Sequence, residues 1–200
     1  MRFKIVLLSV FAAVLALFEA METRAFGGET SGPVRNRLIT RNSAGPVHIG
    51  MTVAQARKAM PGVRFARTTD GEGMALIELK RGKTLEMILY AGEENAEKPI
   101  NEKAKIEMIS IFGPSYRTAE GVYPGMPLKE VEKVYGKLVR LTMSEIESRE
   151  YAEFSHEPDG LSFRAGLPEI GVAGIYPEGS RETKSYEPSA VVTNVEISGR

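Results

Sequence analysis

Two short segments of the chain share one pattern of apolar and polar positions. They read "IGMTVAQARKAMPG", beginning at Ile49, and "PGMPLKEVEKVYGK", beginning at Pro124. The apolar positions are Val53, Ala56 and Met60 in the first segment, and Leu128, Val131, Val134 and Tyr135 in the second. Spacings of three and four residues are typical of the buried face of an amphipathic helix. We therefore predict one short helix in each segment.

A Gly-Met pair stands before each predicted helix. Thr52 follows the first pair and is a suitable N-cap, because its hydroxyl can accept a hydrogen bond from an amide of the first turn. Pro127 takes the equivalent place in the second segment, and proline is favoured in a first helical turn. We interpret the glycines as backbone turns and expect both methionines to be buried, so the repeated pair predicts architecture and no reaction.

Alternating or continuous apolar runs, separated by turn signals, predict strands after each helix. Asp70-Gly71, Arg81-Gly82 and Asp159-Gly160 mark tight turns between them. The predicted strands are "VRFARTT", "ALIELK", "TLEMILY" and "KIEMISIF" in the first half, and "LVRLTM", "YAEFSH", "LSFRAG" and "AVVTNVEIS" in the second.

This order predicts an α+β fold of tandem helix-plus-antiparallel-sheet repeats. The repeats should form two layers, with the helices packed on one face of the sheet, because an amphipathic helix must bury its apolar stripe. We assign residues 45–113 to the first repeat, 114–120 to a connector and 121–199 to the second repeat.

The first 25 residues resemble a signal peptide. Arg2 and Lys4 precede an apolar run of fourteen residues, 5–18, which is shorter than the roughly 20 residues that span a bilayer. We expect cleavage after Ala25, with Ala20 as the rival position, and a flexible polar linker over 26–44. The mature protein is then periplasmic or secreted.

Composition narrows the classes of function. The chain has no cysteine, so neither disulfides nor the lipid-modified cysteine of a lipoprotein can hold it. Its 26 basic and 26 acidic residues balance, and no basic cluster with interleaved aromatics stands out. We therefore expect no nucleic-acid partner and no membrane span in the mature form.

The residues that usually carry catalysis or bind metals are sparse. His48 and His156 are the two histidines, and no ligand spacing surrounds either. Asp70 and Asp159 both precede glycine, which turn chemistry explains. Ser155-His156-Glu157 lies in a predicted strand, where neighbours point to opposite faces, so we expect no triad. We predict no catalytic residue, no metal site and no cofactor.

The remaining candidates are residues suited to contact with another protein. Two long loops are predicted at 92–104 and 168–189, and aromatic residues are common at binding hot spots. The candidate binding residues are Tyr116, Tyr123, Tyr176 and Tyr186. The alternative is that these rings cover edges of their own domain.

Both Gly-Met segments resemble the opening of small helix-plus-sheet modules of bacterial envelope proteins, including the SmpA/OmlA outer-membrane assembly lipoproteins and the tandem-repeat β-lactamase inhibitory protein. The stretch "GPVHIGMTVAQARKAMPG", with "IELKRGKTLEMILY", is also similar to an uncharacterised family of envelope-stress-regulated lipoproteins. The likeness covers most of residues 45–199. It implies noncatalytic binding or assembly in the periplasm, although this chain lacks the lipobox cysteine and the cysteines of the inhibitor's repeats.

We therefore expect a noncatalytic, exported protein-binding module of the bacterial envelope, acting as an assembly factor or as an inhibitor of an enzyme. Its partner should be another envelope or extracellular protein. The alternative is a small periplasmic hydrolase or ligand-processing enzyme with a glutamate-based site, because glutamates are the abundant carboxylates of the chain.

Overall fold

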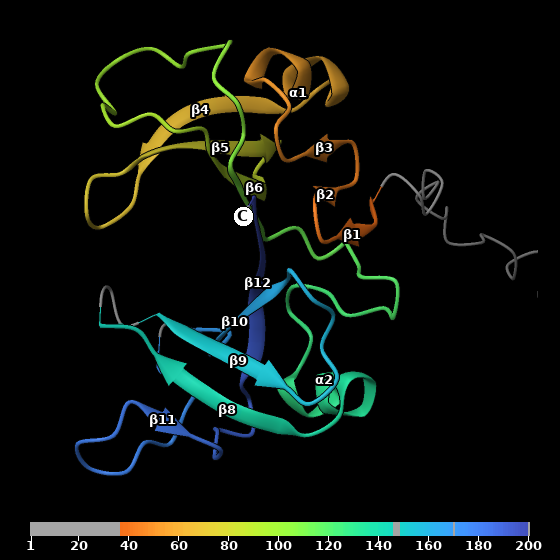
Figure 1. Ribbon diagram of the computed structural model, residues 1–200, viewed down its shortest axis with the longest axis vertical. Helices are drawn as coiled ribbons and strands as arrows, with labels where there is room; N and C mark the ends of the chain where they lie inside the picture. The colour runs from red at the N-terminus through yellow and green to blue at the C-terminus, as the bar shows by residue number, and fades with distance from the viewer. Residues whose placement is uncertain (1–36, 146–148, 170, 200) are drawn as a thin grey trace, which may run out of the picture. The chain divides into compact units, whose positions relative to one another are not determined.

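The computed structural model describes residues 37–145, 149–169 and 171–199, all within one of the two compact units into which the chain divides (Figure 1). The expected signal peptide, 1–25, lies outside the described residues. The helices are α1 (Val53–Ala59) and α2 (Leu128–Tyr135). The strands are β1 (Ile39–Thr40), β2 (Ser43–Ala44), β3 (Val47–His48), β4 (Arg64–Thr69), β5 (Ala75–Arg81), β6 (Thr84–Tyr90), β7 (Met108–Ile111), β8 (Leu138–Met143), β9 (Glu150–Phe154), β10 (Ser162–Gly166), β11 (Glu182–Thr183) and β12 (Val191–Ser198).

One antiparallel sheet of nine strands dominates the structure. Its order is β11-β8-β9-β10-β12-β7-β6-β5-β4. The strands of the first half, β4 to β7, and those of the second half meet where β12 pairs with β7, for example at Val195 opposite Ile111. The eight strands predicted from alternation are all present in this sheet, because one face of each is buried.

A second, three-stranded sheet was not predicted. β1, β2 and β3 form it from very short strands, and their residues Ile39, Ala44 and Val47 are fully or almost fully buried in the core. The predicted linker 26–44 is therefore wrong for its last residues, which are folded. Each strand has only two residues, too few for an alternating pattern to be seen in the sequence.

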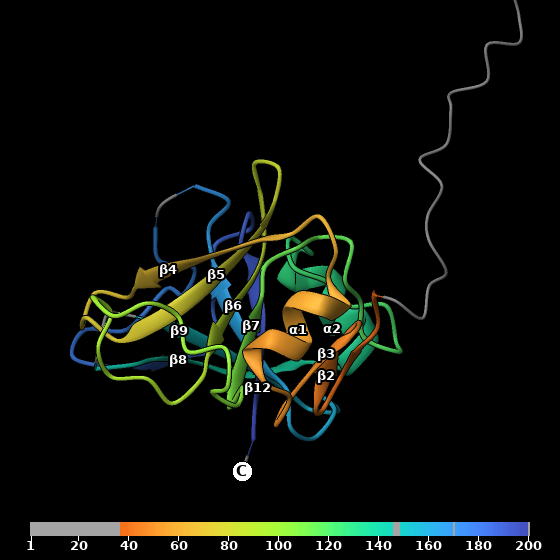
Figure 2. The same ribbon diagram turned by 90° about the horizontal axis from the view of Figure 1, so that it is seen from above.

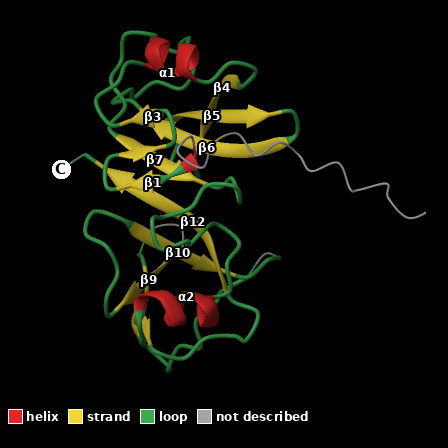
Figure 3. Ribbon diagram, turned by 90° about the vertical axis from the view of Figure 1, so that its right-hand side faces the viewer, coloured by secondary structure: helices red, strands yellow, loops and turns green. Residues whose placement is uncertain are grey.

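Both helices occupy the predicted positions but are only 7 and 8 residues long. Val53, Ala56 and Met60 at α1 are buried, as are Leu128, Val131 and Tyr135 at α2. Val134, the fourth residue of the predicted second stripe, is only partly buried against the core. Figure 3 shows how small a share of the described chain is helical. None of the helices in the described ranges is long and apolar enough to cross a membrane.

The predicted two-layer α+β architecture of helix-plus-sheet repeats, with helices packed on one face, is therefore wrong: the fold is a β-rich antiparallel one. Two short helices cannot form a layer over nine strands. Part of the cover comes instead from the small sheet, because β2 lies close to β7 and α1 lies beside β3 (Figures 1 and 2). The helical pattern was correct locally, but it overstated how much of the core the helices bury.

Candidate functional site

The segment between β10 and β12, residues 168–189, was predicted as one long loop. It contains the two-residue strand β11, and its residue 170 is not described. We call it the anchored loop. Glu150, the first residue of β9, is only 3 % exposed. Its carboxylate accepts hydrogen bonds from the amides of Ala173 (2.5 Å) and Gly174 (2.7 Å) and from the Tyr176 hydroxyl (2.9 Å). Three donors compensate the buried charge and fix the loop to the sheet.

A second carboxylate holds the other side of the loop. The Tyr186 hydroxyl donates to Glu132 of α2 at 2.6 Å. Backbone hydrogen bonds then close the loop on itself, from the Ile175 amide to the Ser185 carbonyl and from the Glu187 amide to the Ala173 carbonyl, both at 2.8 Å. The loop is thus tied to a strand, to a helix and across its own width.

These ties leave two aliphatic side chains facing solvent. Val172 is 44 % exposed and Ile175 is 51 % exposed, whereas Ala173 between them is fully buried. Met74, in the turn between β4 and β5, is the other large hydrophobic residue that is exposed among the described residues. The anchored loop therefore presents two apolar groups on a backbone that is fixed by Glu150.

Burial and the neighbouring carboxylates shift the ionisation of both loop tyrosines. Burial, followed by the hydrogen bond and the charge of Glu132, raises the pKa of Tyr186 to about 12. Burial and Glu150 likewise raise the pKa of Tyr176 well above its ordinary value. Both hydroxyls remain protonated donors at neutral pH, which is what the contacts with the carboxylates require.

The four tyrosines predicted to bind a partner do not form one surface. Tyr176 and Tyr186 lie in the anchored loop, and their hydroxyls donate to Glu150 and Glu132. Tyr116 is 2 % exposed, and its hydroxyl donates to the buried Glu86 at 3.3 Å. Tyr123 is half-buried beneath the Arg117 guanidinium, 4.1 Å from the ring centroid. All four tyrosines therefore make contacts within their own chain, and their role in binding a partner stays a prediction.

Sequence reasoning missed the residues that carry the loop, although a signal was present. Glu150, Ala152 and Phe154 are two residues apart along β9 and are all buried, so they share one face of the strand. This period of two therefore indicates a carboxylate on the core face. Val172 and Ile175 lie in the apolar stretch "GVAGIY" of the loop predicted at 168–189, where no packing partner was predicted.

The expectation that Ser155 and His156 point apart was wrong. Both lie in a turn just after β9, and Ser155 Oγ is 3.0 Å from His156 Nδ1. Their amides donate to the carbonyls of Lys137 and Tyr135, and Glu157 Oε2 accepts from the Phe154 amide at 2.9 Å. These three amides are therefore already engaged and are not free to form an oxyanion hole.

A cleft of about 690 Å³ lies between the β1–β2 turn, the β9–β10 turn and the end of β12. Arg41 and Asp159 are the charged residues in its lining, and both are exposed to solvent. No group of three or more histidines or carboxylates that could hold a metal ion occurs in the described ranges.

Comparison with known proteins gives the fold alone. No protein-family model matches the sequence, and no curated protein matches it. Among solved structures, the chain is similar to the uncharacterized protein yfeY from Escherichia coli, with a TM-score of 0.54 and 14 % sequence identity. The match covers 80 % of this chain and 99 % of that one, so the described architecture also occurs in another protein.

Proposed function

We propose that the protein is an exported, noncatalytic module that binds another protein through the anchored loop. One observation carries this proposal: Val172 and Ile175 are exposed on a loop whose intervening backbone is clamped by the buried Glu150. Export is proposed from the apolar N-terminal run, and the partner would be an envelope or extracellular protein.

The clamp has an energetic meaning for binding. Ordering a loop at an interface reduces affinity, so a loop that is already fixed binds more tightly for the same contacts. Here the amides and the Tyr176 hydroxyl hold the loop before any partner arrives. Two exposed aliphatic side chains on such a loop supply apolar surface of the kind found at the centre of protein interfaces.

The test is capture of partners from periplasmic extract by the immobilised protein. The amount captured is compared with that captured by two variants, each of which replaces exposed hydrophobic residues by serine. Val172→Ser/Ile175→Ser should abolish saturable capture of a partner while the thermal unfolding midpoint, Tm, stays unchanged. Met74→Ser removes an exposed hydrophobic side chain in the other half of the sheet and should retain capture. Equal capture by all three proteins would overturn the assignment of the loop.

The enzymatic alternative is tested with the same preparations. Turnover of a panel of ester, peptide and glycoside substrates, lost on replacing one glutamate by glutamine, would reverse the proposal. Glu150→Gln is the first such variant to assay, because Glu150 is the most buried carboxylate among the described residues.

A further inference from the structure

The two edges of the large sheet differ in how open they are. β11 forms one edge with only two residues. β4 forms the other with six, it pairs with β5 without a bulge, and it contains no proline. Within the described ranges, β5 is the strand with which β4 pairs. Figure 2 looks onto β4 from this outer side. A long, regular edge strand is a template for another strand.

Charge is distributed unevenly along β4. At its start, Arg64 and Lys80 share one carboxylate, that of Glu78, at 3.1 and 2.6 Å. Lys58 at the end of α1 and Lys83 in the β5–β6 turn are also exposed there. The two remaining arginines of this end are already paired, Arg57 with Glu102 and Arg81 with Glu86. The start of β4 therefore has a positive excess.

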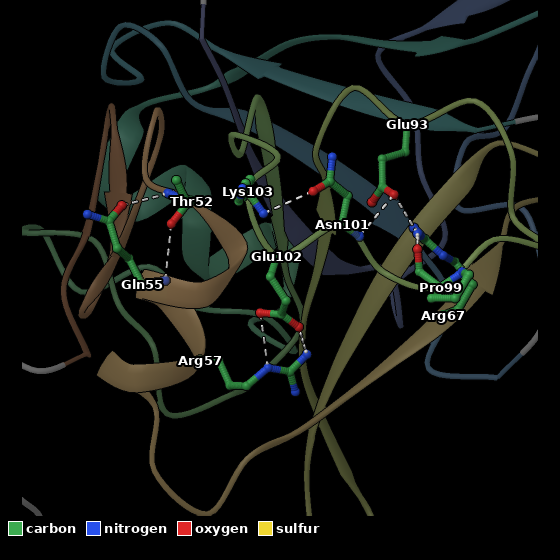
Figure 4. A network of polar contacts seen from close by, with 9 residues as sticks. All are labelled: Thr52, Gln55, Arg57, Arg67, Glu93, Pro99, Asn101, Glu102 and Lys103. Atoms are coloured by element: carbon green, nitrogen blue, oxygen red, sulfur yellow. Dashed lines mark hydrogen bonds and ion pairs between the residues drawn. The ribbon is translucent and has the colours of Figure 1, made fainter.

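The other end of β4 has a negative excess. Arg67 pairs with Glu93 at 2.7 Å, and it also binds the Pro99 carbonyl, so the segment 93–99 is fixed beside this half of the strand (Figure 4). That segment adds the exposed Glu94 and Glu97 against a single cation, Lys98. The exposed Glu72 lies in the turn that follows β4.

We propose that two copies of the chain pair through their β4 strands, antiparallel and about a two-fold axis. Antiparallel pairing places the start of one β4 against the end of the other, so positive meets negative twice in the same interface. A two-fold interface is self-complementary. A parallel arrangement would instead place like charges together at both ends, which is unfavourable.

The assembly is tested with the full chain by sedimentation velocity over a range of concentrations, and by hydrogen exchange. We expect concentration-dependent dimers that weaken in high salt, with slower exchange of the amides of residues 64–69 in the dimer. Arg64→Glu and Glu72→Arg should each raise the dissociation constant about tenfold or more. The double variant Arg64→Glu/Glu72→Arg should recover affinity, because both contacts are restored with reversed sign.

Arg140→Glu, on β8, is the matched control: it makes the same charge change away from β4 and should leave the dimer intact. A monomer at all concentrations would overturn the proposal. So would a dimer that Arg64→Glu and Glu72→Arg leave unchanged, or one without protection of the β4 amides.

Discussion

The starts of the two helices show the same backbone arrangement built with different side chains. The Gly50 amide donates to Ile106 and the Gly125 amide to Val192, at 2.8 and 2.7 Å. The first residues of the helices, Val53 and Leu128, likewise donate to Ala104 and Ala190. Each helix is thereby fixed to the chain that leads into or begins the last strand of its half. The similar sequences therefore specify this backbone frame.

The side chains at the two starts differ. Thr52 and Gln55 form a capping box, in which each side chain bonds the other's amide (Figure 4). Pro127 makes no side-chain cap and contributes its fixed φ of −58°. A helix start can therefore be stabilised by a hydrogen bond in the folded state. It can also be stabilised by proline, which reduces the conformational entropy of the unfolded chain.

The long loops of the two halves are also fixed by different kinds of contact. Arg57–Glu102 and Arg67–Glu93 tie the first loop to α1 and β4 with ion pairs (Figure 4). Tyrosine hydroxyls and backbone amides tie the second loop to Glu132 and Glu150. We expect salt and acid to weaken the contacts of the first loop, and alkali to weaken those of the second.

The largest effect is expected from truncating the residue that begins each helix. Both Leu128 and Val53 are 0 % exposed. Leu128→Ala should lower the free energy of unfolding by about 2–5 kcal/mol. Val53→Ala removes fewer methyl and methylene groups and should cost less. Urea unfolding measures both, and a cost for Leu128→Ala below that of Val53→Ala would mean that the two helices are not equivalent in the core.

The glycines should be next in magnitude and equal to each other. Gly50 has φ +82° and Gly125 has φ +95°, and an added Cβ would meet no atom within 4 Å at either position. Gly50→Ala and Gly125→Ala should therefore cost only the strained backbone, about 1–3 kcal/mol each. Clearly unequal losses in urea unfolding would break the equivalence of the two starts.

Most helices and strands could be predicted from the sequence. The contacts that build the site could not, for a physical reason. Eight strands and both helices follow from periodicity, because each has one face in the core. The methionines after the glycines were expected to be buried, yet Met51 and Met126 are only partly buried, and Val53 and Leu128 are the buried positions. The site depended on pairs distant in sequence, such as Glu150 with Ala173, which no local pattern indicates.

The caps should have smaller and unequal effects. Thr52→Ala should cost about 0.5–2 kcal/mol through the lost hydrogen bond. Pro127→Ala should cost about 0.4–1 kcal/mol through greater freedom of the unfolded chain. Combining Thr52→Ala with Gln55→Ala tests the capping box, since their effects on unfolding should not add. Strict additivity would show that the two hydrogen bonds do not act together.

The loops should show the smallest effects, at opposite ends of the pH scale. Burial by itself would raise the pKa of Glu93. The hydrogen bonds from Arg67 and from the Asn101 amide, together with the charge of Arg67, outweigh burial and hold this pKa below its ordinary value of 4.5. The stability that this lowered pKa contributes is present above pH 4.5 and is lost as the pH falls through the lowered pKa. The raised pKa of Tyr186 acts in reverse: its contribution is present below pH 10 and is lost as the pH rises toward about 12.

Absorbance of tyrosinate and urea unfolding at several pH values measure these two contributions. Tyr186→Phe should remove one titrating group near pH 12 and leave the acid side unchanged. Glu93→Gln should weaken only the acid-side dependence. A change at the wrong end of the scale in either variant would contradict the assignment of ion pairs to one loop and tyrosine–glutamate contacts to the other.

Hydrogen exchange at Ala173 and Gly174 tests most directly whether the anchored loop is fixed before binding. Both amides donate to Glu150 and should exchange slowly in the isolated protein, at rates closer to those of the sheet than of an open loop. Glu150→Gln replaces one accepting oxygen with a donor, and should speed exchange at one or both amides. Fast exchange at Ala173 and Gly174 in the unmodified protein would contradict the clamp and, with it, the presentation of Val172 and Ile175.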